Sequence, residues 1–166
     1  MKEKYTIHVI CLGNIARSPA GQLLLQHYCD LEKQKRNSKI SVVVSSSGLS
    51  GGLYTEMEPY SAEYLHTKGI KISSFISQLT TPYILKDQDL ILCMEQYMVD
   101  KVSQMNKSGK ILTFKAAAGL KGDIEDPYGL YKGLYFKIME EINDCAQKIA
   151  KRFYNGEIMD ISGNKE

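Results

Sequence analysis

The chain has 166 residues, of which 43% are hydrophobic, and this composition is ordinary for one globular domain with a sizeable core. Its formal net charge of +2 is too small to indicate nucleic-acid binding, although local positive potential can still attract an anionic ligand. The N-terminus leads into an apolar strand without a long hydrophobic leader, and no run of residues approaches a membrane span. Secretion and membrane insertion are therefore not expected.

Short apolar segments alternate with longer amphipathic ones, which is the pattern of parallel βαβ units. In chain order, strands are expected over residues 5–10, 40–46, 90–94 and 111–114, and helices over 19–33, 59–68, 96–105 and 129–153. Right-handed crossovers would place the helices on both faces of a four-stranded parallel sheet, with a ligand at the carboxyl ends of the strands. We expect a three-layer α/β fold, one domain over residues 1–154, and a C-terminal tail over 155–166 that can fray.

The four cysteines, Cys11, Cys29, Cys93 and Cys145, lack the spacing of a metal site or of a disulfide framework. A reducing, cytoplasmic setting fits this pattern best, and no metal or other cofactor is expected. Cys11 differs from the others because it follows the first expected strand directly.

Residues 11–18 read Cys-Leu-Gly-Asn-Ile-Ala-Arg-Ser, and they connect the first strand to a helix for which Ser18 is the expected N-cap. A helix that starts there directs free backbone N–H groups and its positive dipole end at the loop, which favours an anion and the thiolate of Cys11. Gly13 lets the amides turn inward, and Arg17 offers a planar fork for two oxygens. The loop therefore predicts an oxyanion cradle with a nucleophile. The alternative, an inert buried Cys11 and a surface Arg17, does not explain the order of strand, glycine and helix start.

The segment from Val9 to Pro19 resembles the signature of the low-molecular-weight protein tyrosine phosphatases, whose loop runs Cys-x-Gly-Asn-Ile-Cys-Arg-Ser-Pro. The resemblance continues through residues 45–48, 69–70, 89–94 and 126–128, and so covers nearly the whole chain. It implies a flavodoxin-like fold and a phosphatase that acts through a phosphocysteine intermediate without a metal. The loop residues it assigns to phosphate binding are Leu12, Gly13, Asn14, Ile15, Ala16, Arg17 and Ser18.

Asp126, in the Asp-Pro-Tyr element 126–128, is the candidate general acid and base, because a leaving oxygen needs a proton and this loop is expected above the same edge of the sheet. A turn residue before proline is the alternative. Asp123 and Glu125 are competing carboxylates, and Glu125 stands where the family normally has proline. The resemblance also implies that Ser18 hydrogen-bonds Cys11 and that Asn14 and Ser46 brace the loop, although a helix cap, a turn and a strand position are open alternatives for these three residues.

Ile15, Tyr54 and Tyr128 are expected to wall a slot for a flat aryl phosphate, with generic packing as the alternative for the two tyrosines. Ile at position 15 accompanies tyrosine phosphatases in the resembling family, whereas Thr accompanies arginine phosphatases. The expected partner is thus a phosphotyrosine-containing protein or a small aryl phosphate, bound by a monomer for which weak self-association is left open.

Ala16 replaces a cysteine that many family members use for a protective disulfide with the nucleophile, so this chain cannot form that bond. Two other functions remain open. An arsenate reductase of the same fold would need further cysteines, of which Cys93 is a candidate. A phosphopeptide-binding pseudoenzyme would explain the changes at Ala16 and Glu125, but not the joint presence of Cys11, Arg17 and Asp126.

Overall fold

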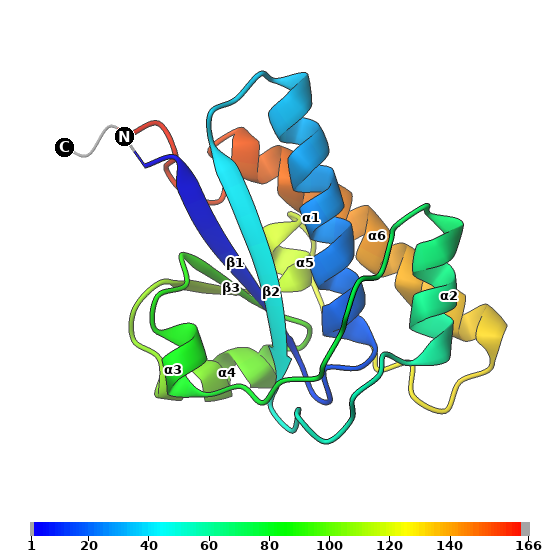
Figure 1. Cartoon of the computed structure of the whole chain (residues 1–166). Coiled ribbons are helices and arrows are strands. Elements are labelled where there is room, and N and C mark those ends of the chain that lie inside the picture. The colour runs from blue at the N-terminus through cyan, green and yellow to red at the C-terminus, as the bar shows by residue number, and fades with distance from the viewer. Residues whose placement is uncertain (1, 164–166) are drawn as a thin grey trace.

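The computed structural model describes residues 2–163, and its strands form one parallel sheet in the order β2-β1-β3-β4 (Figure 1). The strands are β1 Lys4–Cys11, β2 Ser41–Gly48, β3 Leu90–Cys93 and β4 Lys110–Thr113. All neighbouring strands in this sheet run parallel. The expected four-stranded parallel sheet is confirmed.

Helices cover both faces of this sheet. They are α1 Arg17–Lys35, α2 Pro59–Thr67, α3 Pro82–Leu85, α4 Gln96–Met105, α5 Phe114–Ala117 and α6 Lys132–Tyr154. Figure 1 shows α1, α2, α5 and α6 on one side of the sheet, and α3 and α4 on the other. The three-layer α/β architecture is therefore confirmed, and it leaves the carboxyl ends of the strands free of covering helices.

The central strand β1 lies between the two helical layers, and Ile7, Val9 and Ile10 are fully buried there. A strand buried on both faces consists of consecutive apolar residues, as β1 does near its end. Each such aliphatic side chain stabilises the fold by about 1.5–3 kcal/mol. On the α1/α6 side, Tyr5 packs edge to face against Phe153 with ring centroids 5.4 Å apart. This packing fixes the position of Cys11, the last residue of β1.

Several boundaries differ from those expected. Helix α6 begins at Lys132 rather than at residue 129, because Gly129 adopts a φ of 77° that no helix accommodates. Helix α1 begins at Arg17, before Pro19. The prediction of Ser18 as its N-cap is wrong: Ala16 occupies that position without a side-chain hydrogen bond. The hydroxyl of Ser18 is turned to the loop instead, where it contacts Cys11 and Asn14.

The C-terminal segment packs on the fold where it is described. Ile158 and Ile161 are buried, and the ammonium of Lys110 donates to the carbonyl of Ile158. The sequence did not indicate these contacts, because two isolated isoleucines are too few to show a periodic pattern, and fraying of the tail stays a prediction. Residues 164–166 of that tail lie outside the described residues. Within 2–163, each helix is too short or too polar to cross a membrane.

Candidate active site

A cradle formed by residues 11–17 connects the end of β1 to the start of α1. Cys11 ends the strand, Arg17 begins the helix, and Asn14 between them has a φ of 54°. Asparagine is among the few residues other than glycine that tolerate this left-handed conformation. The sequence thus allows the chain to fold back on itself around the thiol.

The cradle holds most of its carbonyl groups outward. Each of five cradle carbonyls accepts a hydrogen bond from a surrounding segment: Cys11 O from Leu49 N at 3.0 Å, Leu12 O from Ser50 N at 2.8 Å, Gly13 O from Ser77 Oγ at 3.0 Å, Ile15 O from Glu58 N at 2.8 Å and Ala16 O from Ser61 Oγ at 3.3 Å. In a trans peptide the C=O and the following N–H point in opposite directions. The amides that follow these carbonyls therefore face the hollow, where they can donate to the oxygens of an anion.

The thiol of Cys11 lies at the floor of this cradle and is only 3% exposed. Its Sγ is 2.9 Å from Ser18 Oγ and accepts from the Asn14 amide at 3.3 Å. The Asn14 side chain donates to Ser18 Oγ at 2.8 Å and to Ser46 Oγ at 2.9 Å, and it accepts from Gln78 N at 2.9 Å. The structure therefore brings Asn14, Ser18 and Ser46 together around the thiol.

Arg17 extends from the first turn of α1 and its side chain is only 2% exposed. Its Nη1 donates to Glu95 Oε2 at 2.7 Å and to the Ile124 carbonyl at 2.8 Å, while Nη2 lies 3.6 Å from Asp126 Oδ2. One arm of the guanidinium is thus anchored and the other faces the hollow. Sequence reasoning missed Glu95, although its place two residues after the end of β3, at the carboxyl edge of the sheet, was an available signal.

Asp126 projects over the same hollow and its side chain is 45% exposed. Its Oδ1 accepts from the Tyr128 amide at 3.0 Å, which fixes the carboxylate in the turn. Asp123 instead accepts from the Gln96 amide at the start of α4, at 2.9 Å. Glu125 is exposed and does not line the cavity. Of the three carboxylates considered from the sequence, Asp126 alone shares the hollow with Cys11 and Arg17.

The hollow is a cavity of about 290 Å³ that also contains the expected slot residues Ile15, Tyr54 and Tyr128. An adjoining cavity of about 470 Å³ shares these three residues and Glu58. Tyr54 and Tyr128 are 58% and 77% exposed, so their rings are available to a ligand. Sequence reasoning missed Ser50, Leu53 and Glu58, which lie in a loop whose shape depends on contacts with distant segments.

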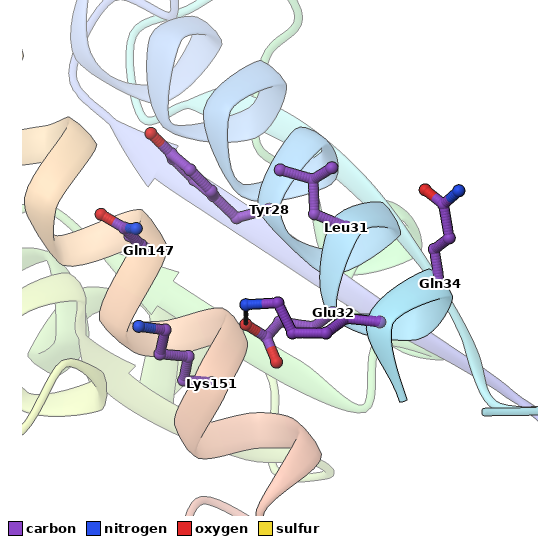
Figure 2. Close-up of a pocket in the computed structure, with 7 residues that line it drawn as sticks. Tyr28, Leu31, Glu32, Gln34, Gln147 and Lys151 are labelled. Carbon is purple, nitrogen blue, oxygen red and sulfur yellow. Dashed lines mark ion pairs between the residues drawn. The ribbon is translucent and has the colours of Figure 1, made fainter. Parts of the chain in front are cut away.

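A second hollow of about 260 Å³ lies between α1 and α6, and Figure 2 shows the side chains around it. Tyr28, Leu31 and Glu32 line it from α1, and Gln147 and Lys151 from α6. Glu32 is buried and pairs with Arg36 at 2.9 Å. None of the predicted site residues lines this groove.

The other three cysteines are buried and do not line the cavity of Cys11. Burial raises the pKa of Cys29 and of Cys93 to about 12 and that of Cys145 to about 11, so all three stay protonated thiols at neutral pH. Cys93 is paired in register with Ile10, which places it on the face of the sheet opposite to that of Cys11. Within residues 2–163, no group of three or more His, Cys, Asp or Glu side chains could hold a metal ion.

Comparison with known families gives a match over most of the chain. A family model described as low molecular weight phosphotyrosine protein phosphatase matches residues 6–157. The probable low molecular weight protein-tyrosine-phosphatase AmsI of Erwinia amylovora is 28% identical, over 86% of this chain and 93% of that protein. The protein-arginine-phosphatase of Bacillus subtilis is 27% identical, over 86% of this chain and 93% of that protein.

Solved structures show the same fold. The crystal structure of the Erwinia amylovora tyrosine phosphatase AmsI superposes with a TM-score of 0.73 and 27% identity, covering 88% of this chain and 91% of that one. The low molecular weight protein tyrosine phosphatase of T. tengcongensis gives a TM-score of 0.77 with 25% identity, covering 89% of this chain and 99% of that one. The similarity therefore extends across the sheet, the helices and the loop that carries the thiol.

Proposed function

We propose that this chain, which belongs to the low molecular weight phosphotyrosine protein phosphatase family, hydrolyses phosphotyrosine and related aryl phosphate monoesters in the cavity of Cys11, Arg17 and Asp126. One observation carries the proposal. A buried thiol, a guanidinium with one arm facing the hollow, inward-facing amides and the carboxylate of Asp126, 3.6 Å from that guanidinium, line one cavity. Together these groups can supply a nucleophile, an oxyanion site and a proton donor.

In the first step, the Cys11 thiolate attacks the phosphorus atom. The S–P bond forms while the bond from phosphorus to the phenolic oxygen breaks, and Asp126 gives its proton to that oxygen. The cradle amides and Arg17 hold the non-bridging oxygens, where negative charge must be stabilised. The phenol leaves and a phosphocysteine remains.

In the second step, a water molecule attacks the phosphorus atom of the phosphocysteine. Asp126, now a carboxylate, accepts a proton from this water, while the S–P bond breaks and its electron pair returns to sulfur. Ser18, 2.9 Å from Sγ, can donate to the departing thiolate. Inorganic phosphate is released and the protonated Asp126 is restored.

The walls of the cavity support an aryl substrate. Ile15 presents an apolar side chain, and Tyr54 and Tyr128 offer aromatic rings against which a phenyl ring can pack. A threonine at position 15 accompanies arginine phosphatases in the family, and this chain carries isoleucine. We extend the proposal to a phosphotyrosine-containing protein as partner, bound by a monomer in the cytoplasm. Phosphoarginine remains the competing substrate to be tested, because one relative is named a protein-arginine-phosphatase.

The alternatives from the sequence receive less support. Arsenate reduction would need a second cysteine to form a disulfide with Cys11, and Cys93 lies on the opposite face with its pKa raised to about 12. A pure phosphopeptide-binding module does not require a carboxylate beside the oxyanion site, yet Asp126 lies there.

The test is metal-free hydrolysis of p-nitrophenyl phosphate and of phosphotyrosine, with phosphoarginine and arsenate as competing reactions. Cys11→Ser should abolish turnover, and Asp126→Asn should lower kcat for phosphotyrosine by about 10²–10⁴-fold, because its phenol leaves poorly without a proton. Cys145→Ala and Asp100→Asn, which change a buried thiol and an exposed carboxylate away from the cavity, are the matched controls. Full turnover by Cys11→Ser would refute the scheme. Faster cleavage of phosphoarginine than of phosphotyrosine would overturn the substrate assignment.

A further inference from the structure

We propose that Ser61 is a positioning residue of the cradle: a buried relay from Tyr135 through Ser61 to the Ala16 carbonyl fixes the direction of the Arg17 backbone N–H. Ser61 belongs to α2 and Tyr135 to α6, so two helices outside the loop set the geometry of its last amide. The inference rests on the proposed function, because it concerns the amides that would hold the phosphate.

The contacts of the relay lie in the interior. Ser61 is fully buried and Tyr135 is 2% exposed. Ser61 Oγ lies 2.7 Å from the Tyr135 hydroxyl and 3.3 Å from the carbonyl oxygen of Ala16. Met139 Sδ, at 3.7 Å, is the other neighbour of Ser61 Oγ, and a thioether is a weak acceptor. The Ala16 carbonyl is therefore the favoured acceptor for the hydrogen of Ser61.

The direction of the relay follows from counting hydrogens. Each hydroxyl has one hydrogen to donate. If Ser61 gives its hydrogen to Ala16, the hydrogen between the two hydroxyls must come from Tyr135. Burial raises the pKa of Tyr135 well above its ordinary value, so the phenol keeps that hydrogen. Tyr135 thus donates to Ser61, and Ser61 donates to the cradle.

Ala16 is a place where such support matters. As the N-cap of α1 it has φ −120° and ψ −77°, and no side chain caps the helix. Its carbonyl receives the first helical hydrogen bond from Ala20 N at 3.4 Å, which is longer than usual for N–H···O. The Ser61 hydroxyl adds a second bond to the same carbonyl at 3.3 Å, which is also long, so the carbonyl depends on both donors. Because the peptide is trans, holding the Ala16 carbonyl toward α2 keeps the Arg17 N–H directed into the cavity.

Side-chain support is the exception within the cradle. The carbonyls of Cys11, Leu12 and Ile15 are held by backbone amides, which a side-chain truncation leaves in place. Hydroxyl groups hold the carbonyls of Gly13 and Ala16. Ser61 is the donor at the peptide next to Arg17, so its removal should loosen one oxyanion amide while the thiol and its Ser18 contact stay in place.

The test measures oxyanion binding and turnover in the full chain. Ser61→Ala should weaken inhibition by vanadate about tenfold and lower kcat for p-nitrophenyl phosphate by a similar factor, which is less than the 10²–10³ that follows complete loss of an oxyanion donor. Tyr135→Phe should have a smaller effect, because Ser61 can still donate to Ala16. Adding Tyr135→Phe to Ser61→Ala should cause no further loss, and Ser61→Thr should keep wild-type inhibition. Ser103→Ala, at an exposed hydroxyl that donates to the Val99 carbonyl within α4, is the matched control.

Two readouts separate positioning from general damage. Thermal unfolding monitors the fold, and the rate of Cys11 alkylation by iodoacetamide, followed against pH, should keep its wild-type midpoint in Ser61→Ala. Unchanged vanadate inhibition in Ser61→Ala, or additive losses in the double variant, would overturn the relay. Should Ser61→Ala fail to fold, wild-type inhibition by a folded Ser61→Thr together with a measurable loss in Tyr135→Phe would support it, and any other pair of results would refute it. Phosphate binding measured by calorimetry tests the relay even if the wild-type chain hydrolyses no phosphotyrosine. Absence of hydrolysis would refute the proposed function but not the relay.

Discussion

At the scale of single residues, a histidine lies inside the sheet beside the cradle. His8 is 1% exposed, and its two ring nitrogens lie 2.7 Å from Ser45 Oγ and 2.7 Å from Ser47 Oγ. Ser47 Oγ in turn lies 2.7 Å from Thr80 Oγ1, and the Ser47 carbonyl oxygen lies 3.3 Å from Ser18 Oγ. Burial lowers the pKa of His8 from 6.5 to about 4. The ring is therefore neutral in the folded protein, with one nitrogen donating and the other accepting.

This histidine predicts acid sensitivity of the fold. Between pH 6.5 and about 4 the unfolded chain binds a proton at His8 that the folded chain does not, so stability falls as the pH falls through this window. The loss can reach about 3 kcal/mol at pH 4, since each unit of pKa difference corresponds to about 1.4 kcal/mol. Urea unfolding of the wild type, His8→Gln and the exposed-site control His66→Gln, from pH 7.5 to 4.5, measures it. An equally steep decline in His8→Gln would contradict the assignment.

The residues of the site differ in how far the sequence alone reveals them. Cys11, Arg17 and Asn14 lie in one continuous motif whose residue types already indicate an anion site. His8 and Glu95 do not, because their partners are 37 or more positions away and become neighbours only through strand pairing. Ser18 shows the opposite failure: its local context predicts a helix cap, but the thiol competes for the same hydroxyl. Local patterns thus fail where a polar side chain has a tertiary partner.

At the scale of elements, the end of β2 supports the cradle through a residue without a side chain. A Cβ on Gly48 would lie 2.5 Å from the Leu12 carbonyl oxygen and 2.7 Å from the Asn14 amide nitrogen. Gly48 also accepts from Thr80 N at 2.8 Å and donates to Gln78 O at 2.9 Å. Main chain surrounds this position, so a larger residue must displace the loop itself.

Gly48→Ala is therefore expected to impair the site and the fold together. The clash should cost about 1–3 kcal/mol of unfolding free energy, as overpacking does, and should lower kcat/KM for p-nitrophenyl phosphate at least tenfold because the cradle amides move. Gly133→Ala in the first turn of α6 is the matched control. Its Cβ would meet only the ring of Tyr131, which is 69% exposed and can rotate away. Chemical unfolding measures the loss of stability, and steady-state kinetics with vanadate as inhibitor measures the effect on the cradle. Unchanged vanadate inhibition in Gly48→Ala would show that the cradle tolerates a methyl group at this position.

Periodicity and breaker residues located the long elements but not the short ones. The range 96–105 expected for α4 is the range observed, since it has a clear apolar stripe. Helices α3 and α5 span four residues each, about one turn, and no periodicity can be read over such a length. Gly129 was expected to open α6, but its left-handed conformation belongs to the Asp-Pro-Tyr turn before the helix. The boundary of a helix that follows a functional loop therefore depends on the side chains that the loop must position.

At the scale of the whole molecule, the net charge of +2 does not reflect the charge at the mouth of the candidate cavity, where carboxylates outnumber cations. Arg17 is the only cation among the described residues that line the candidate cavity, whereas Asp126 and Glu58 line it as well. Glu56 adds a further carboxylate in the adjoining cavity. Glu95 forms an ion pair with Nη1 of Arg17, which reduces the positive potential that a substrate meets in the cavity. The carboxylates around the cradle therefore repel acidic groups of a substrate, whereas the cradle itself attracts the phosphate.

This distribution predicts a preference among phosphotyrosine peptides. A peptide with lysine next to phosphotyrosine should be cleaved with a kcat/KM about three- to tenfold higher than one with glutamate there, because opposite charges at a protein surface speed encounter and like charges slow it. The ratio should fall toward one as ionic strength rises from 0.02 to 0.5 M, since exposed charges are screened over a few ångströms at that salt concentration. Glu56→Gln should reduce the ratio at low salt, and Glu3→Gln, at the opposite end of β1, should leave it unchanged. A ratio that does not depend on salt would mean that the carboxylates at the mouth do not select the substrate.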